Sequence, residues 1–310
     1  MARTVRIGTR GSALALAQSR WVENRIKARY PEIVTELVVI KTSGDQLKDV
    51  PLAQVGGKGL FVKEIEEAVL AGRVDMAVHS LKDMPAAMPA GCVLGAVPPR
   101  EDWRDALISR NYQSLAEIPA GGRIGTGSLR RRAQILHRRP DLEVVPLRGN
   151  VDTRLRKMAE QGLDAVILAA AGLNRLGLTN LPKALLSEKE MLPAVSQGAL
   201  GLEIRAQDQE MQKLLEFLDD PPTRSAVTAE RAFLARLEGG CLVPVAALAR
   251  VRGGKLFLEA MISDPDGRRL FREETSGTVG EAADLGRALA ERLLKRGGRE
   301  ILSEIYGLTV

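Results

Sequence analysis

A cysteine directly after two glycines is the first residue in this chain whose setting suggests covalent chemistry. Cys241 lies in the stretch Glu238-Gly-Gly-Cys-Leu-Val-Pro244, between a predicted helix and a set of predicted strands. Gly239 and Gly240 can adopt backbone angles that side chains forbid, so the thiol is predicted to project from a loop tip. A single cysteine in an intracellular chain is more often a small buried hydrophobe. Two interpretations therefore stay open: a structural thiol, or one that bonds to another molecule.

Three predicted strand-to-helix turns carry arginines. The strands cover residues 123–125, 142–147 and 165–168, and each is followed by a helical pattern. Parallel βαβ units place such turns at one edge of a sheet. Because a guanidinium can bind a carboxylate through two parallel hydrogen bonds, the turns together predict a pocket for several carboxylates. The arginines concerned are Arg130, Arg131, Arg148, Arg154 and Arg175.

The helix predicted over 129–138 begins with three successive arginines, residues 130–132. Thr126 and Ser128 precede it, and Ser128 is a good N-cap. Cations in a first helical turn oppose the helix dipole, so local stability is given up there. A bound anion would remove this conflict, and nucleic-acid phosphate is the alternative to a carboxylate ligand.

A polar stretch, His79-Ser-Leu-Lys-Asp-Met-Pro85, follows the strand predicted over 75–78. Ligands of α/β proteins usually bind at the ends of strands. Lys82 and Asp83 form a local ion pair in one interpretation. In the other, Asp83 faces a cationic or N–H-bearing group while Lys82 faces a carboxylate. His79 has apolar neighbours, which favour a buried histidine with its hydrogen bonds satisfied.

The N-terminal region adds a further arginine and a glycine-rich loop. A strand over 5–8 leads to Arg10 and to Ser12, which is predicted to cap a helix over roughly 13–29. The apolar face of this helix is predicted to hold Leu14, Ala17, Trp21 and either Val22 or Arg25. Arg10 precedes a helix N-terminus that favours anions, although a solvated surface arginine is the better interpretation of this residue taken alone. The loop over 43–59 holds Lys58 among glycines and predicts a lid or an anion-binding nest, without the Walker A order.

Composition limits the classes of partner. The 310 residues suffice for two or three domains, and the net charge of +6 suggests an anionic partner. Aromatic residues make up only 3%, so few side chains could stack on nucleic-acid bases. Two cysteines fit a reducing compartment, and Cys92 has the setting of a structural residue. We see neither a signal sequence nor an apolar run that could span a bilayer, and therefore predict a cytoplasmic protein.

Two stretches are predicted as domain boundaries, residues 98–102 and 219–222. The βα pattern restarts after the first boundary, and residues 197–204 are predicted to cross back into the first domain. After the second, a helix over 223–237 precedes an antiparallel meander and two closing helices. The predicted meander strands are 243–250, 255–263 and 268–276, and the closing helices are 281–296 and 300–306.

Eight stretches in family order resemble the porphobilinogen deaminase (hydroxymethylbilane synthase) family, and together they span almost all of the chain. Any one of them would be weak, whereas the ordered set is specific. They are Ile7-Gly-Thr-Arg-Gly-Ser12, Gly56-Gly-Lys-Gly-Leu-Phe-Val-Lys-Glu64, Ala77-Val-His-Ser-Leu-Lys-Asp-Met-Pro85, Ser128-Leu-Arg-Arg131, Leu147-Arg-Gly-Asn-Val151, Leu168-Ala-Ala-Ala-Gly-Leu173, Pro193-Ala-Val-Ser-Gln-Gly198, and Glu230-Arg through Glu238-Gly-Gly-Cys241.

The resemblance implies an α/β fold with three domains. Two domains resemble the halves of type II periplasmic binding proteins, with a cleft between them, and a smaller C-terminal α+β domain has a three-stranded antiparallel sheet. We predict domain 1 over 1–98 and 198–218, domain 2 over 103–194, and domain 3, which carries the cysteine, over 221–310.

The resemblance also implies a transferase of tetrapyrrole synthesis. Such an enzyme joins four porphobilinogen molecules head to tail, releases ammonia at each step, and frees hydroxymethylbilane by hydrolysis. A dipyrromethane cofactor is joined through a thioether to the residue matching Cys241. Asp83 matches the aspartate that assists deamination and stabilises the charged azafulvene-like intermediate. We predict no metal site and no partner beyond the small-molecule substrate, and we expect a monomer.

Further positions match the family's binding residues. Lys82, Ser12, Ser80, Thr126, Ser128, Arg130 and Arg131 match cofactor-binding positions, and Arg10, Lys58, Arg148, Arg154 and Arg175 match positions that bind the growing chain. Two positions depart from the pattern. Gln54 stands where relatives often have a basic residue, and Gly127 replaces a frequent serine, so one contact at each is in doubt.

The chemistry of the substrate explains these residue types independently. Each porphobilinogen carries two carboxylates and one aminomethyl group, so arginines are needed to neutralise the growing chain. Loss of ammonia leaves a cation, which needs a carboxylate nearby. A covalent anchor keeps the intermediates from diffusing away. A protein that only captures a small dicarboxylate would explain the arginines but leaves Cys241 without a task. A nucleic-acid binder would explain the basic helix starts, and the low aromatic content argues against it.

Overall fold

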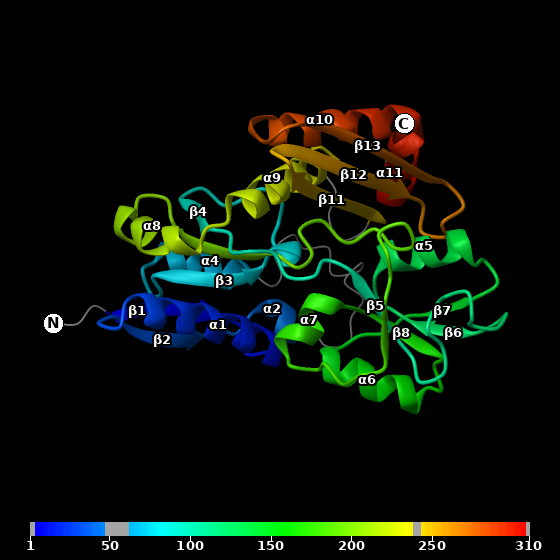
Figure 1. Cartoon of the computed structure of the whole chain (residues 1–310), viewed down its shortest axis with the longest axis horizontal. Helices are drawn as coiled ribbons and strands as arrows, with labels where there is room; N and C mark the ends of the chain where they lie inside the picture. The colour runs from blue at the N-terminus through cyan, green and yellow to red at the C-terminus, as the bar shows by residue number, and fades with distance from the viewer. Residues whose placement is uncertain (1–3, 47–61, 238–242, 308–310) are drawn as a thin grey trace. The chain divides into compact units, whose positions relative to one another are not determined.

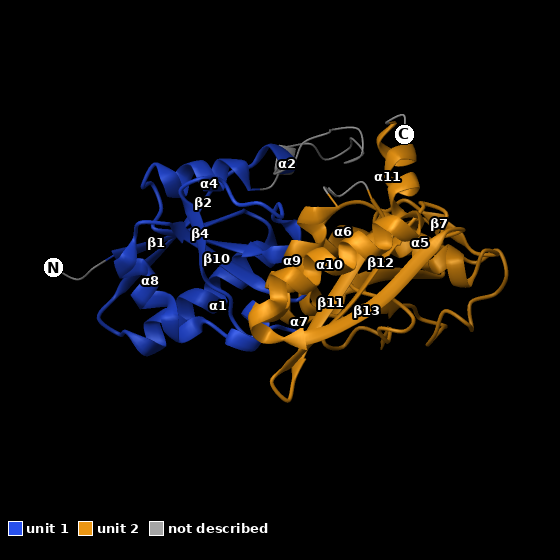
Figure 2. Cartoon of the chain, turned by 90° about the horizontal axis from the view of Figure 1, so that it is seen from above, with its two compact units in different colours: residues 1–50, 55–101, 198–224 blue, residues 51–54, 102–197, 225–310 orange. Residues whose placement is uncertain are grey.

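The computed structural model describes residues 4–46, 62–237 and 243–307. Within them, the chain divides into two compact units (Figures 1 and 2), and the described residues form three sheets. The first unit comprises the described parts of 1–101 together with 198–224, and the second comprises 102–197 and the described part of 225–310. The division at 101/102 falls within the predicted boundary 98–102.

The sheet of the first unit has the order β2-β1-β3-β10-β4. β1 (Thr4–Thr9) pairs in parallel with β2 (Val34–Val39) and β3 (Met76–Ser80). β10 (Leu200–Arg205) runs antiparallel between β3 and β4 (Cys92–Ala96). β10 thus returns the chain to the first unit, as predicted for residues 197–204. Since β3 and β10 are buried on both faces, they read as nearly continuous apolar runs.

Helices cover both faces of this sheet. α1 (Ala13–Arg29) and α8 (Gln209–Leu215), which continues into η2 (Glu216–Leu218), pack on the face that carries Met76 and Val78. α4 (Lys63–Leu70) packs on the opposite face, together with Ala77 and Cys92. Cys92 is therefore a core residue, as predicted.

The predicted apolar face of α1 is wrong at Trp21, whereas the alternative Val22 is buried and the bounds of the helix are confirmed. Val22 and Ile26 pack inward with Gln18 and Ser19, whereas Trp21 is 39% exposed. The Trp21 ring instead lies at the surface with the Arg25 guanidinium carbon 5.5 Å from its centroid. Trp21 therefore makes a cation–π contact at the surface, although the helical periodicity predicted it in the core.

The first sheet of the second unit repeats the same order with β7-β6-β8-β5-β9. β6 (Arg123–Gly125) is parallel to β7 (Glu143–Val145) and β8 (Ala165–Ala169). β5 (Asp105–Ile108) runs antiparallel between β8 and β9 (Lys183–Leu185). The helices that follow the parallel strands are α5 (Leu129–Arg138), α6 (Val151–Glu160) and α7 (Ala170–Arg175).

The same two-sheet order confirms the predicted fold class. In the spatial order of each sheet, three parallel strands are followed by one antiparallel strand, β10 or β5. In each case this strand is formed just after the chain has passed from the other unit. This is the arrangement expected of two type II periplasmic-binding-protein-like halves.

The C-terminal part of the second unit holds the predicted antiparallel meander of β11 (Val245–Arg252), β12 (Lys255–Ser263) and β13 (Leu270–Thr278). α10 (Ala282–Leu293) packs on β12 and β13 (Figure 1), and α9 (Pro221–Arg236) contributes Phe233 to the same core. A short 3-10 turn, η3 (Val279–Glu281), precedes α10. The π turn η4 (Leu294–Gly298) joins α10 to α11 (Arg299–Tyr306).

The two sheets of the second unit are joined by direct contacts. Leu192 packs with Met261 in one small core, and His137 Nδ1 lies 2.8 Å from the Gly267 carbonyl oxygen. Gly267 has a φ of +71°, and a Cβ there would lie 2.1 Å from the Ala133 carbonyl oxygen. These contacts explain why the two sheets form one compact unit. The separation of domains 2 and 3 stays a prediction.

Several short elements were missed in the sequence. β4, β5 and β9 have no predicted counterpart, and the loop expected over 43–59 begins with a single helical turn, α2 (Ser43–Gln46). Strands of three to five residues give too little periodicity to distinguish them from loops. Among the described residues, no helix has both the length and the apolar composition needed to cross a membrane.

Candidate functional site

A pocket of about 50 Å³ in the first unit brings together four of the predicted site residues: Arg10, Ser12, Ser80 and Asp83. β1 and β3 are parallel, so the residues that follow them meet at one edge of the sheet. Two more polar residues, Gln18 and His79, also line the pocket. The structure thus places these four residues around one pocket, and their roles stay predictions.

Local hydrogen bonds fix the backbone around this pocket. Ser12 caps α1, as predicted, because its Oγ accepts a hydrogen bond from the Ala15 N–H at 3.3 Å. The Gln18 side-chain amide donates to Ser80 Oγ at 2.8 Å, which ties α1 to the end of β3. Asp83 ends the short 3-10 turn η1 (Leu81–Asp83) and is exposed, so its carboxylate is accessible to a ligand. Lys82 in the same turn is half-buried.

His79 is buried and hydrogen-bonded, as its apolar neighbours suggested, but its partner was missed. Its Nε2 lies 2.9 Å from Glu203 Oε2, and Glu203 is completely buried on β10. A glutamate inside the apolar run 200–205 was the available signal, because an acidic residue is rarely fully buried without a partner.

The second unit brings the predicted strand-to-helix turns to one edge. β6, β7 and β8 are parallel, so the turns after Gly125, Val145 and Ala169 lie on the same side of the sheet. Ser128 caps α5 by accepting from the Arg131 N–H, and Asn150 caps α6 by accepting from the Thr153 N–H. Thr126 Oγ1 accepts from the Ser128 N–H at 3.2 Å. The predicted common edge is confirmed.

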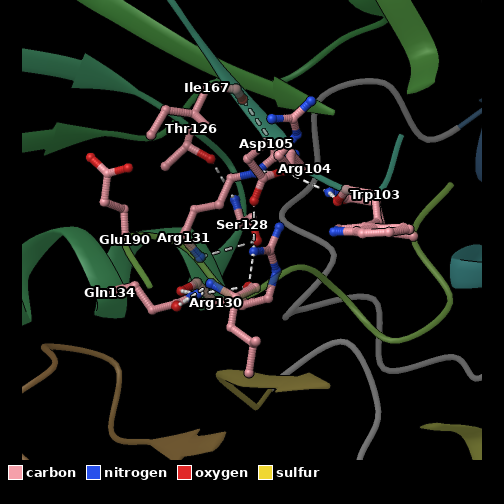
Figure 3. A network of polar contacts seen from close by, with 12 residues as sticks. Trp103, Arg104, Asp105, Thr126, Ser128, Arg130, Arg131, Gln134, Ile167 and Glu190 are labelled. Atoms are coloured by element: carbon pink, nitrogen blue, oxygen red, sulfur yellow. Dashed lines mark hydrogen bonds and ion pairs between the residues drawn. The ribbon is translucent and has the colours of Figure 1, made fainter. Parts of the chain in front are cut away.

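Arg130 and Arg131 converge on one carboxylate of the chain itself, that of Asp105 (Figure 3). Arg130 Nη1 donates to Asp105 Oδ2 at 2.7 Å, and Arg131 Nη2 donates to Oδ1 at 2.8 Å. The arginines are 5% and 4% exposed, and the aspartate is fully buried. The anion that the first turn of α5 requires is thus supplied in part by β5, which the sequence did not indicate.

Electrostatics of this cluster favour an ionised aspartate. Burial alone would raise the pKa of the Asp105 carboxyl, but Arg130 and Arg131 outweigh it and hold that pKa well below its usual range. The Gln197 side-chain amide donates to Asp105 Oδ1 at 2.8 Å and so completes the partners of that oxygen. Two guanidiniums facing one carboxylate leave the three side chains with one excess positive charge.

The remaining predicted arginines of this unit belong to the segments that follow the parallel strands. Arg148 follows β7, Arg154 lies in the first turns of α6, and Arg175 ends α7. All three are half-buried. Gly127 lies in the turn before α5, where a Cβ would lie 2.7 Å from the Leu147 carbonyl oxygen, so a serine at this position would require a shifted turn.

Three predicted positions lie outside the described residues: Lys58, Cys241 and Gln54. Their roles stay predictions.

Two family models match this chain. The model described as "Porphobilinogen deaminase, dipyromethane cofactor binding domain" matches residues 5–213, and "Porphobilinogen deaminase, C-terminal domain" matches residues 225–295. Together they cover most of both units.

Curated relatives match over nearly the whole length. The porphobilinogen deaminase of Syntrophus aciditrophicus is 56% identical over 97% of this chain and 98% of its own length. That of Pelobacter propionicus is 54% identical over 98% of each chain. Matches among solved structures include the methionine-binding protein MetQ, with a TM-score of 0.42 and 12% identity over 69% of this chain and 88% of that chain. The family assignment depends on the family models and the relatives.

Proposed function

The chain belongs to the porphobilinogen deaminase family, and we propose that it joins four porphobilinogen molecules head to tail, with release of ammonia, to give hydroxymethylbilane. The observation that carries this proposal is 56% identity to a porphobilinogen deaminase over 97% of the chain. The accessible Asp83 beside Arg10 in one pocket adds a chemical reason, because the substrate has both a cationic and an anionic end.

The family's dipyrromethane cofactor fits the donor set of the second unit. The buried cluster of Arg130, Arg131 and Asp105 has one excess positive charge, which a carboxylate of the cofactor would neutralise. We assign Thr126 and Ser128 at the start of α5, and Ser12, Ser80 and Lys82 in the first unit, to the same cofactor. When bound through Cys241, the cofactor supplies the primer to which substrate units are added.

Asp83 is proposed as the catalytic residue. Loss of ammonia from the aminomethyl group leaves a cation on the substrate, and a carboxylate close by stabilises that charge. Asp83 is exposed and lines the pocket, so it can contact the reacting group directly.

The substrate-binding arginines are proposed to hold the carboxylates of the growing chain. Arg10 in the first unit, and Arg148, Arg154 and Arg175 in the second, offer planar donors that match carboxylate geometry. Lys58 is assigned to the same task from the resemblance.

We further propose a cytoplasmic monomer that does not bind nucleic acid. Aromatic residues make up only 3% of the chain, so few side chains could stack on nucleic-acid bases. The two cysteines of the sequence fit a reducing compartment.

Intact mass and turnover test the proposal together. The purified protein should carry a mass excess equal to two linked pyrrole units, which Cys241→Ser should abolish, and it should consume porphobilinogen. Asp83→Ala should retain the cofactor in part and turn over very slowly. A bare polypeptide mass, with binding of a dicarboxylate but no turnover, would instead identify a binding protein.

A further inference from the structure

A histidine–glutamate pair lies behind the pocket of the first unit. His79 on β3 and Glu203 on β10 are 5% and 0% exposed, and His79 Nε2 is 2.9 Å from Glu203 Oε2. Glu203 is directly opposite Ala77 in the antiparallel register, so His79 and Glu203 are diagonal neighbours on one face of the sheet. The sheet itself therefore determines their contact.

Glu203 shares a buried environment with Cys92 and Glu66. Its Oε1 is buried and has no hydrogen-bond partner among the described residues. Burial, together with Glu203, raises the pKa of the Cys92 thiol to about 12, and burial and Glu203 also raise the pKa of the Glu66 carboxyl. The oxygen of Glu203 that faces His79 is Oε2.

A carboxylate can only accept a hydrogen bond, so this contact determines the tautomer of a neutral His79. Nε2 carries the proton and donates it, and Nδ1 is left as an acceptor. Within the part of the chain that the structure describes, Nδ1 has no hydrogen-bond partner. His79 lines the same pocket as Asp83, Ser80 and Arg10.

We propose that Glu203 is a positioning residue that holds His79 as a hydrogen-bond acceptor, and that His79 Nδ1 and Asp83 together receive the ammonium end of porphobilinogen. This inference rests on the proposed function. An aminomethyl ammonium has three N–H donors, which two acceptors in one small pocket can engage. The pocket of about 50 Å³ exceeds the roughly 10–15 Å³ that one water needs, so it suits a small group of this kind. Arg10 beside it suits a carboxylate of the same molecule.

Nuclear magnetic resonance of the histidine rings tests the tautomer without any turnover. The chain has two histidines, so ring-¹⁵N-histidine labelling gives two spin systems, and His137→Gln assigns the other one. At pH 8 we expect His79 in the tautomer with a protonated Nε2, and a changed ring signature in Glu203→Gln. A protonated Nδ1 in the unsubstituted protein, alone or together with Nε2, overturns the proposal.

A double-mutant cycle tests the functional consequence. Glu203→Gln should lower kcat/KM for porphobilinogen about tenfold or more, as loss of a carboxylate that orients a histidine commonly does. In a His79→Leu background the same change should have little further effect, because Glu203 acts through His79. Full additivity of the two substitutions would overturn the inference.

A matched carboxylate elsewhere in the unit is the control. Asp75 accepts hydrogen bonds from Arg6 at the opposite end of β3, so Asp75→Asn removes an ion pair without touching the pocket. Its effect should add to that of His79→Leu. If His79→Leu does not fold, the ring signatures of the unsubstituted protein and of Glu203→Gln decide alone. Absence of turnover in the unsubstituted protein would contradict the proposed function and leave the tautomer result to judge this inference.

Discussion

Replacing Asp105 by asparagine should strongly destabilise the second unit. The substitution keeps the shape of the side chain but removes the negative charge that faces Arg130 and Arg131. The carbonyl oxygen of asparagine can still accept from one neighbour, whereas the second guanidinium is left buried beside an amide. Breaking one partner of a buried ion pair costs about 3–5 kcal/mol, because the remaining charge is desolvated without compensation. Packing is unchanged, so the electrostatic loss decides the result.

Urea unfolding measures this loss. We expect the midpoint of Asp105→Asn to fall by at least about 1 M, given slopes on the order of 1–3 kcal/mol per M. Asp266→Asn is the matched control, because Asp266 pairs with Arg132 of the same helical turn in a largely exposed position. That surface pair should contribute within about 1 kcal/mol. Equal midpoints for the two variants would refute the argument from buried charge.

The pH dependence of the free energy of unfolding gives a second, independent test of the contribution of Asp105. The folded-state pKa of Asp105 is depressed, so its contribution is fully present above the unfolded pKa of about 3.9 and is lost as pH falls through the folded value. The difference in the free energy of unfolding between the unsubstituted protein and Asp105→Asn should therefore be constant above about pH 5 and shrink below about pH 4. A difference that grew on acidification would contradict the assigned direction of the pKa.

Three further predictions concern stability and thiol reactivity. Gly267→Ala should lower the free energy of unfolding by about 3 kcal/mol or more, because a Cβ there would lie 2.1 Å from the Ala133 carbonyl oxygen. Gly253 also has a positive φ but faces open space, so Gly253→Ala should cost about 1 kcal/mol. Equal losses in thermal unfolding would refute the packing argument. Glu230→Gln should cost about 3 kcal/mol, since the carboxylate accepts from the backbone N–H groups of Ser196 and Ala249 at 2.5 and 2.7 Å, and an unchanged melting temperature would refute it. In Cys241→Ser protein, Cys92 should react with a disulfide reagent at pH 8 only after unfolding, because it is buried and its pKa is about 12; rapid labelling of the native protein would contradict this.

Long periodic elements with side-chain caps could be predicted from the sequence. The bounds of α1 and α5 agree with the predicted ones, because Ser12 and Ser128 are N-caps that mark the first turns. The common edge of the strand-to-helix turns followed from the βαβ pattern alone. β5 could not be predicted, because four residues beside a proline-rich boundary give no usable period.

The sequence also predicted arginines at a helix start but could not say which anion they face. A first-turn arginine indicates only that negative charge is needed nearby. Here part of that charge comes from Asp105, about 25 residues earlier in the chain and on a strand that was missed. The identity of such an anion depends on tertiary pairing, which local patterns do not contain.

The two buried carboxylates, Asp105 and Glu203, occupy related places in the two sheets. Each lies on the antiparallel strand inserted beside the third parallel strand: β5 beside β8, and β10 beside β3. Each is hydrogen-bonded to a nitrogen-bearing side chain near the edge where the parallel strands end, Arg130 and Arg131 in one case and His79 in the other. Side chains of a strand project from the two faces of its sheet, so a fully buried acid on the inserted strand can orient a binding group without reaching the ligand. This geometry explains why both residues escape a search for exposed functional side chains, and why their removal should change the orientation of binding groups more than their number.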